Sequence, residues 1–154
     1  MSVKHDTFVI ERVYPAPPAR VFAAWASPEA KSRWFVGPHN RDTTNHRLDF
    51  RVGGRESVSA GSPGGPVYSY NAVYQDIVPG ERIVSTYEMH ADDARISVSL
   101  ATVEFRAEGT GTRLILTEQG AFLDGLDNVQ SREQGTGGLL DNLAAELERA
   151  PAAV

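Results

Sequence analysis

The spacing of apolar and polar residues changes twice along the chain. Residues 8–14 are rich in β-branched and aromatic side chains, which is typical of a strand. The prolines within residues 15–18 end this strand and open a helix, because proline is tolerated in a first helical turn. Val21, Phe22 and Trp25 then recur at the spacing of one helix face. The chain is therefore predicted to begin with a strand followed by a helix.

A second, short helix is predicted directly after the first. Ser27 supplies a capping hydroxyl, and Pro28 suits the first helical position. Glu29 lies where the positive end of the helix dipole favours an acid. Trp34 and Phe35 stand at the end of this helix. We therefore expect two short helices between the first and the second strand.

Beyond residue 40 the apolar positions recur at every second residue. Leu48, Phe50 and Val52 alternate with charged residues, which places apolar side chains on one face of a strand. Gly53-Gly54 is typical of a hairpin turn, and the Gly/Pro-rich residues 61–66 predict a longer hairpin loop. The remaining strand-like runs are residues 55–60, 67–77, 82–89, 96–105 and 112–118. Alternation of this kind favours an antiparallel meander over a parallel sheet.

The last third of the chain returns to a helical pattern. We expect one long helix that begins near Asn128 or Ser131 and ends before Pro151. Its apolar stripe consists of Leu139, Leu140, Leu143, Ala144 and Leu147. The predicted fold class is α+β, a single domain over residues 1–154. A curved antiparallel sheet of about seven strands wraps around the long C-terminal helix, and two short helices follow the first strand. Three leucines of the helix are expected to pack on the concave sheet face beside three sheet residues: Leu139, Leu143 and Leu147 beside Phe50, Val103 and Phe105.

Composition narrows the classes of function. The chain has 154 residues, a formal net charge of −5 and no cysteine, which excludes disulfides, thiolate nucleophiles and zinc–thiolate sites. The basic residues, nearly all arginine, are scattered as on a solvated surface, and this argues against a nucleic-acid partner. No leader segment and no apolar run of bilayer length occur, so we expect a cytoplasmic protein without membrane insertion.

The motifs of common catalytic sites are missing from the sequence. The four histidines lack the spacing of a metal site, and the serines lack a Gly-x-Ser-x-Gly motif. The glycines at 109 and 111 lie between two strands rather than before a helix, which argues against a phosphate-binding loop. We therefore predict no catalytic residue, no metal and no cofactor.

Several segments, in this order, resemble one known superfamily. The sequence is similar to the START-like (SRPBCC) helix-grip proteins, and within them to the bacterial family similar to the C-terminal domain of the activator of heat-shock protein 90 ATPase. The resemblance covers about residues 7–149, nearly the whole chain. The segments that carry it are Tyr14 to Phe22, Ser27-Pro28-Glu29 with Trp34-Phe35, Leu48 to Arg55, Pro79 to Val84, Thr102 to Phe105, Gly111 to Leu114 and Gly138 to Leu143.

The resemblance implies an apolar cavity between the sheet and the long helix, with the short helices closing one end. The expected function is a module that holds a small hydrophobic or aromatic molecule there. One alternative is an aromatase/cyclase-type enzyme on a polyketide-like substrate, with acid–base help from His46, Glu88 or Glu118. Another is a co-chaperone-like module that stimulates a chaperone ATPase. Co-chaperone members carry a further N-terminal domain, and only six residues precede the first predicted strand here, so a chaperone is the less expected partner. A homodimer through the sheet edges is compatible with the pattern.

Ten residues are candidates for ligand contact. The aromatic ones are Trp25, Trp34, Phe35, Phe50, Tyr74, Tyr87 and Phe105. His46 is in phase with Leu48, and Glu118 is in phase with Leu116, which places both near the inward face; the alternative for His46 is a strand end that faces solvent. A buried Glu118 would need an arginine partner or a wet cavity mouth. Gly138, like its neighbours Gly135 and Gly137, costs helix stability, which suggests that it leaves space for a ligand; the alternatives are a helix break or a bulky sheet residue.

Overall fold

A computed structural model of the protein describes residues 1–36, 45–61 and 63–149. The described part combines a seven-stranded sheet with short helices after the first strand and one long C-terminal helix, which confirms the predicted α+β fold class. The strands are β1 (Val3–Tyr14), β2 (Arg47–Leu48), β3 (Arg55–Gly61), β4 (Val67–Val78), β5 (Arg82–Ala91), β6 (Ala94–Glu108) and β7 (Gly111–Leu123). The helices are α1 (Pro18–Ala26), α2 (Pro28–Lys31), the π-helical turn η1 (Ser32–Val36) and α3 (Val129–Arg149).

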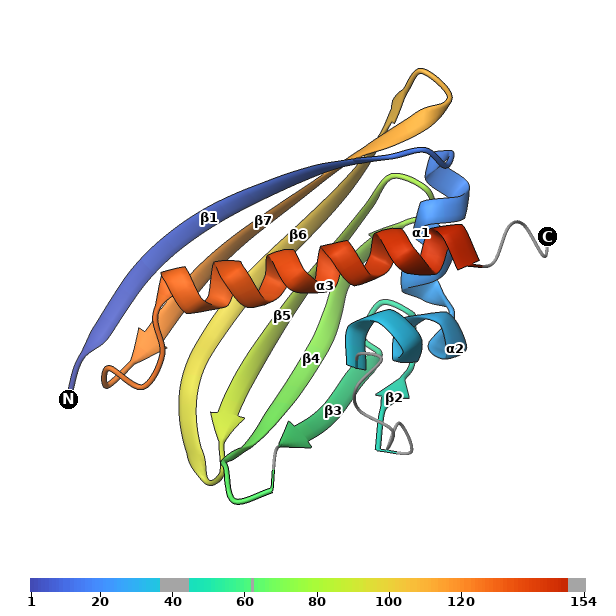
Figure 1. The fold of residues 1–154 in the computed structure, drawn as a ribbon. Helices are drawn as coiled ribbons and strands as arrows, with labels where there is room; N and C mark the ends of the chain where they lie inside the picture. Colours follow the sequence, from blue (N-terminus) through green and yellow to red (C-terminus); the bar gives the residue numbers. More distant parts are fainter. Residues whose placement is uncertain (37–44, 62, 150–154) are drawn as a thin grey trace.

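The sheet is antiparallel throughout and follows the order β1-β7-β6-β5-β4-β3-β2. It is strongly curved, and α3 runs across its concave side (Figure 1). The short helices α1 and α2 lie at one end, where they connect β1 to β2. This arrangement leaves the first half of α3 facing the open part of the sheet, where a cavity lies.

The two short helices begin as their sequence predicts. α1 has proline at its start, and the Ser27 hydroxyl accepts a hydrogen bond from the Ala30 backbone N–H at 3.2 Å, which caps α2. The second helix then widens into η1, which carries Trp34 and Phe35. The indole N–H of Trp34 donates to the Ala24 carbonyl at 2.9 Å and ties η1 to α1.

The long helix starts at Val129 because Asn128 caps it. The side-chain oxygen of Asn128 accepts a hydrogen bond from the Ser131 N–H at 2.9 Å. The three glycines of its first half do not break it, since α3 continues to Arg149. The predicted stop at Pro151 and residue 62 of the predicted 61–66 loop lie outside the described residues.

The strand predicted over Leu48, Phe50 and Val52 is wrong beyond Leu48. The chain turns at Asp49, where the Arg51 N–H donates to the Asp49 carbonyl at 3.0 Å. Gly53 follows in the left-handed region, with φ of 83°, and closes the turn. Val52 is therefore 57% exposed rather than inward. Strands β6 and β7, in contrast, run several residues further than their predicted ends.

The core lies between α3, α1 and the concave sheet face. Leu143 is fully buried there together with Val103 and Phe105, as the sequence predicts. Leu139, Leu147 and Phe50 are half-buried and pack against this cluster. Leu140 is as deeply buried as Leu143, and its backbone carbonyl accepts a hydrogen bond of 2.8 Å from the Tyr14 hydroxyl, which binds α3 to β1.

Candidate ligand-binding site

A cavity of about 540 Å³ lies between the sheet and the first half of α3. Its floor is formed by inward side chains of β3 to β7, and one end is formed by η1 and its neighbours. The lining is mainly apolar and aromatic. Tyr68 and Leu126 border it and are about half exposed, so they mark its open side. The cavity is thus an apolar space with access to solvent.

Aromatic side chains fill the space between α1 and the sheet and limit the cavity at that end. Phe22 packs edge-on against Phe50 and Phe105, with ring centroids 5.7 and 5.4 Å apart. Phe50 also contacts Tyr74 at 5.0 Å, and Phe105 contacts Trp25 at 6.2 Å. Neither Phe50 nor Phe105 lines the cavity. Phe22 packs against both rings, and whether either residue contacts a ligand stays a prediction.

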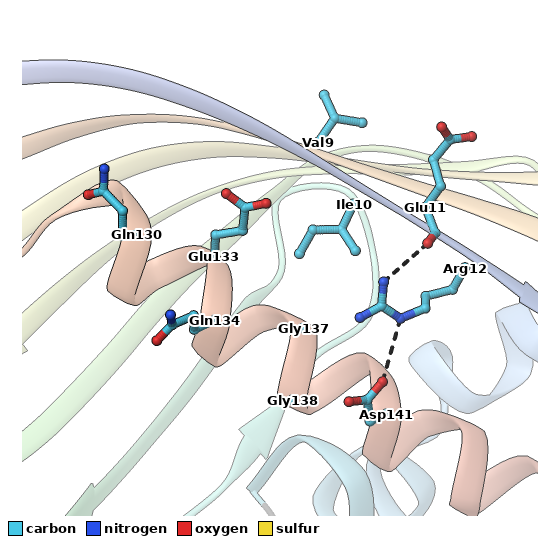
Figure 2. A pocket seen from close by; sticks show the side chains of 10 residues that line it. All are labelled: Val9, Ile10, Glu11, Arg12, Gln130, Glu133, Gln134, Gly137, Gly138 and Asp141. Atoms are coloured by element: carbon cyan, nitrogen blue, oxygen red, sulfur yellow. Dashed lines mark hydrogen bonds and ion pairs between the residues drawn. The ribbon is translucent and has the colours of Figure 1, made fainter.

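Two faces of α3 border two different spaces. Ser131, Arg132, Gly135, Thr136, Leu139 and Leu140 face the cavity. The other side of the helix and the edge strand β1 form an open groove of about 680 Å³ (Figure 2). The α3 residues that line this groove are Gln130, Glu133, Gln134, Gly137, Gly138 and Asp141.

Gly138 therefore does not border the cavity, contrary to the prediction. Figure 2 labels it on the groove side of α3, with Asp141 one turn further along, where that carboxylate pairs with Arg12 at 3.5 Å. The helix glycine that lines the cavity is Gly135, three residues earlier and offset by about 60° around the helix axis. A Cβ at either position meets no atom within 4 Å, so neither glycine makes room for a bulky neighbour.

A polar cluster stands at the α3 side of the cavity, formed by Tyr87, Ser97, Ser99, Glu118, Asp127 and Arg132, here called the Arg132 cluster. Arg132 donates to Ser97 at 2.7 Å and to Asp127 at 2.8 Å, and its Nη1 lies 3.2 Å from Glu118 Oε2. The Tyr87 hydroxyl donates to Glu118 at 2.7 Å. Burial, and next the charge of Glu118, raises the pKa of Tyr87, so its hydroxyl stays protonated and can donate.

The sequence argument that a buried Glu118 needs an arginine partner is met by Arg132. Glu118 is 3% exposed and Arg132 is 9% exposed, so the pair lies inside the protein. Both oxygens of Glu118 accept hydrogen bonds, from Tyr87 and, for Oε2, also from Ser99 at 2.9 Å. Hydrogen bonds from Tyr87, Ser99 and Arg132 therefore fix the position of the Glu118 carboxylate.

A second buried ion pair lies at the η1 end of the cavity. Lys31 Nζ is 2.7 Å from Glu56 Oε1, and both side chains are at most 3% exposed. The Lys31 ammonium also lies over aromatic rings, 4.4 Å from the centroid of Phe35 and 5.3 Å from that of Trp25. Lys31 lines the cavity, whereas Glu56 lies behind it. The expectation that the basic residues form a solvated surface set is therefore wrong for Lys31 and Arg132.

Glu56 is ionised because three neighbours outweigh its burial. Burial alone raises the pKa of a carboxyl, but the Lys31 charge and hydrogen bonds from His46, Lys31 and Tyr74 lower the pKa of Glu56 to about 2. His46 Nε2 donates to Glu56 at 2.8 Å, and His46 Nδ1 lies 2.5 Å from the Ser32 hydroxyl. His46 thus contacts Glu56 on the side away from the cavity and does not line it, and its ligand contact stays a prediction.

The structure brings six of the ten predicted contact residues to the cavity. They are Trp25, Trp34, Phe35, Tyr74, Tyr87 and Glu118. Whether they contact a ligand stays a prediction. Of the acid–base candidates, Glu88 lies outside the cavity, 40% exposed in its side chain and 3.7 Å from Arg95.

Sequence reasoning missed four charged residues of the site, namely Lys31, Glu56, Asp127 and Arg132. Glu56 is in phase with Val58 and Ala60, which line the cavity, and the alternation of β3 could have found it. Lys31 and Arg132 carried no such signal, because a charge on a short helix or a helix start is usually solvated. Within residues 1–36, 45–61 and 63–149, no three His, Asp or Glu side chains gather as metal ligands would, and no helix there is both long and apolar enough to span a membrane.

Known proteins with the same fold are similar to this chain in sequence. The sequence model of the family described as Activator of Hsp90 ATPase homolog 1-like protein matches residues 15–148. The Mll3558 protein of Rhizobium loti is 49% identical over 96% of this chain and 100% of its own, with a TM-score of 0.88. An uncharacterised protein from Rhizobium leguminosarum is 48% identical over 97% of this chain and 98% of its own, with a TM-score of 0.93. No curated protein matches the chain significantly.

More distant structures show the fold alone. DynU16, from the dynemicin biosynthetic locus, is 15% identical over 93% of this chain and 47% of its own, with a TM-score of 0.67. These neighbours and the family match support the START-like helix-grip architecture that the sequence resembles.

Proposed function

The chain belongs to the Activator of Hsp90 ATPase homolog 1-like family, and from this premise we propose that it is a binding module for a small hydrophobic or aromatic molecule. The observation that carries the proposal is the cavity of about 540 Å³ beneath α3. Pockets for small ligands are typically about 300–1,000 Å³, mostly apolar, with a few placed polar groups. The cavity matches this description in size and lining.

The two ends of the cavity offer different contacts to a ligand. Aromatic rings from η1 and β4, including Phe35 and Tyr70 with centroids 5.0 Å apart, offer faces and edges to a planar ligand. The Arg132 cluster supplies hydrogen-bonding groups near the open side. A molecule with an apolar body and a polar end fits both features.

A titration with the uncharged dye N-phenyl-1-naphthylamine tests the proposal. We expect saturable binding with enhanced fluorescence, and displacement by some aromatic or lipid-like compounds. Gly135→Leu at the open side and Ala101→Leu on the floor should each weaken dye binding by about tenfold, because the added side chains enter the cavity.

Gly138→Leu is the matched control for this titration. Its added side chain also starts in open space, but on the groove side of the same helix. Dye affinity should stay at the wild-type value. Absence of saturable binding in the wild type, or equal loss in all three variants, would contradict a ligand site beneath α3.

A second candidate function, catalysis of the aromatase/cyclase type, has one observation in its favour. Glu118 places a carboxylate inside the cavity, where an acid–base group would be needed. Its oxygens already accept hydrogen bonds from Tyr87, Ser99 and Arg132. A carboxylate held in this way orients a neighbouring group more readily than it removes a proton from a substrate, and we therefore favour binding over catalysis.

A further inference from the structure

Resting on the proposed binding function, we infer that the cavity selects uncharged ligands that carry hydroxyl or carbonyl oxygens, and that it excludes otherwise similar carboxylates and sulfonates. The inference depends on how the charges along the cavity are paired and on which polar groups are left without a partner. Each of these is argued from the described residues.

Both positive charges that line the described cavity are already neutralised. Lys31 lies 2.7 Å from Glu56, and Arg132 lies 3.2 Å from Glu118 and 2.8 Å from Asp127. An anionic ligand would therefore find no unpaired cation among these residues. Transfer of a charge from water into such a site is unfavourable unless a partner compensates it.

The Arg132 cluster has an excess of negative charge. Two carboxylates, Glu118 and Asp127, surround one guanidinium, and Tyr87 remains neutral. Asp127 lies nearest to solvent, with 18% of its side chain exposed, whereas the side chain of Glu118 is 4% exposed. Because electrostatic effects are strong where water is excluded, a ligand carboxylate near this cluster is repelled.

Among the described residues that line the cavity, the polar groups without a hydrogen bond include the buried indole N–H of Trp25 and several hydroxyls, all of them neutral. Ser85 is 8% exposed and lines the cavity, and its hydroxyl makes no hydrogen bond to any described residue. Tyr70 and Thr136 also line the cavity without a hydrogen bond from their hydroxyls to the described part of the chain. Burial raises the pKa of Tyr70, which keeps its hydroxyl protonated.

These hydroxyls indicate which polar groups the ligand carries. A hydroxyl both donates and accepts, so it pairs with a ligand hydroxyl or carbonyl without any charge. Buried polar groups are normally hydrogen-bonded, and neither the Trp25 indole N–H nor the Ser85 hydroxyl has such a partner among the described residues. An uncharged ligand with oxygen substituents on an apolar body satisfies these groups and adds no charge to the cavity.

A pair of dyes with the same aromatic body tests the charge selection directly. N-phenyl-1-naphthylamine is uncharged, and 8-anilino-1-naphthalenesulfonate adds one sulfonate to it. We expect the sulfonate to bind at least about tenfold more weakly to the folded wild type, since its charge finds no free cation. Equal or tighter binding of the sulfonate would overturn the inference.

Removal of the Asp127 carboxylate should weaken the selection. Asp127→Asn leaves the Arg132–Glu118 pair in place and should raise sulfonate-dye affinity by about threefold to tenfold, with little change for the neutral dye. Glu133→Gln, on the groove side of α3, is the control of equal charge change and should move neither affinity. A sulfonate affinity that stays unchanged in Asp127→Asn would contradict the role of this cluster.

The hydroxyl part of the inference has its own test. 2-Naphthol should displace the neutral dye several-fold more effectively than naphthalene, and Ser85→Ala should reduce this preference. If no uncharged probe binds at all, the proposed function itself fails. If neutral and anionic probes bind alike, the binding function stands and only the selectivity is refuted. Thermal unfolding of each variant verifies that it is folded.

Discussion

Arg132 and Glu118 join the first turn of α3 to β7 inside the cavity, with guanidinium Nη1 3.2 Å from carboxylate Oε2. Both side chains are less than a tenth exposed. Tyr87 and Ser99 complete the hydrogen bonding of the carboxylate. The pair therefore holds the helix over the cavity at the end where α3 is not packed into the core.

Breaking this pair on one side should be costly. Arg132→Met leaves Glu118 as an uncompensated buried carboxylate, and we expect a loss of about 3–5 kcal/mol in the free energy of unfolding. The double variant Arg132→Met with Glu118→Gln should recover part of this loss, because no buried charge remains. Urea unfolding of the single and double variants measures the difference. Additive losses in the double variant would show that the two side chains are not coupled.

The Lys31–Glu56 pair predicts a pH dependence of stability. The pKa of Glu56 is about 2 in the folded protein, below its ordinary value of 4.5, so folding favours its ionised form. The associated stability is fully present above pH 4.5 and is lost as the pH falls toward 2, an effect on the order of 3 kcal/mol. Urea unfolding between pH 7 and pH 2.5 should therefore show a weaker pH dependence in Glu56→Gln than in the wild type.

An ion pair whose arginine is open to solvent supplies the contrast, although its carboxylate, that of Glu146, is only 4% exposed. Arg33 binds both oxygens of Glu146 at 2.9 and 2.7 Å, but the side chain of Arg33 is 42% exposed. Its hydrogen bond lowers the pKa of Glu146, and solvent screening limits what the pair contributes. We expect Arg33→Met to cost less than Lys31→Met, because Arg149 Nη1 still lies 3.6 Å from the Glu146 carboxylate, whereas Glu56 loses its ammonium partner. Equal losses in urea unfolding would contradict the assigned burial of Lys31.

Most of the fold could be predicted because its signals are local and periodic. The cap at Asn128, the proline starts of α1 and α2 and the two-residue alternation each depend on neighbours in sequence. The end of β2 escaped prediction for the opposite reason. The turn at Asp49 is closed in part by the Gly53 N–H, which donates to the Tyr74 carbonyl at 2.8 Å from a distant strand.

The site was less predictable because its members meet only in three dimensions. Strand parity placed Tyr87 and Glu118 on the inward face, and the cost of burying a carboxylate predicted either an arginine partner or a wet cavity mouth for Glu118. It could not name Arg132, which comes from a helix start in another part of the chain. Parity also could not separate Phe50 and Phe105 from the cavity, because Phe22 of α1 fills the space in front of both rings.

Packing of α3 on the sheet gives a prediction with a clear control. Leu143 is fully buried in the core, so Leu143→Ala should lower the free energy of unfolding by about 2–5 kcal/mol. Val9 on β1 is 53% exposed, and Val9→Ala should cost less than about 0.5 kcal/mol. Chemical denaturation of both variants checks the pair. Similar losses for the two would be incompatible with the described position of α3.

The glycines of α3 should be replaceable at a gain in stability. A Cβ on Gly138 meets no atom within 4 Å, and the position is helical, so Gly138→Ala should stabilise the protein by about 0.5–1 kcal/mol. A Cβ on Gly137 would lie 3.4 Å from Nη2 of Arg12, whose side chain pairs with Asp141, so the gain there should be smaller. Thermal unfolding should rank Gly138→Ala above Gly137→Ala. A lowered melting temperature for Gly138→Ala would contradict this prediction. Because the described neighbours of Gly138 leave room for the added methyl group, such a result would mean that the groove beside it is filled in solution.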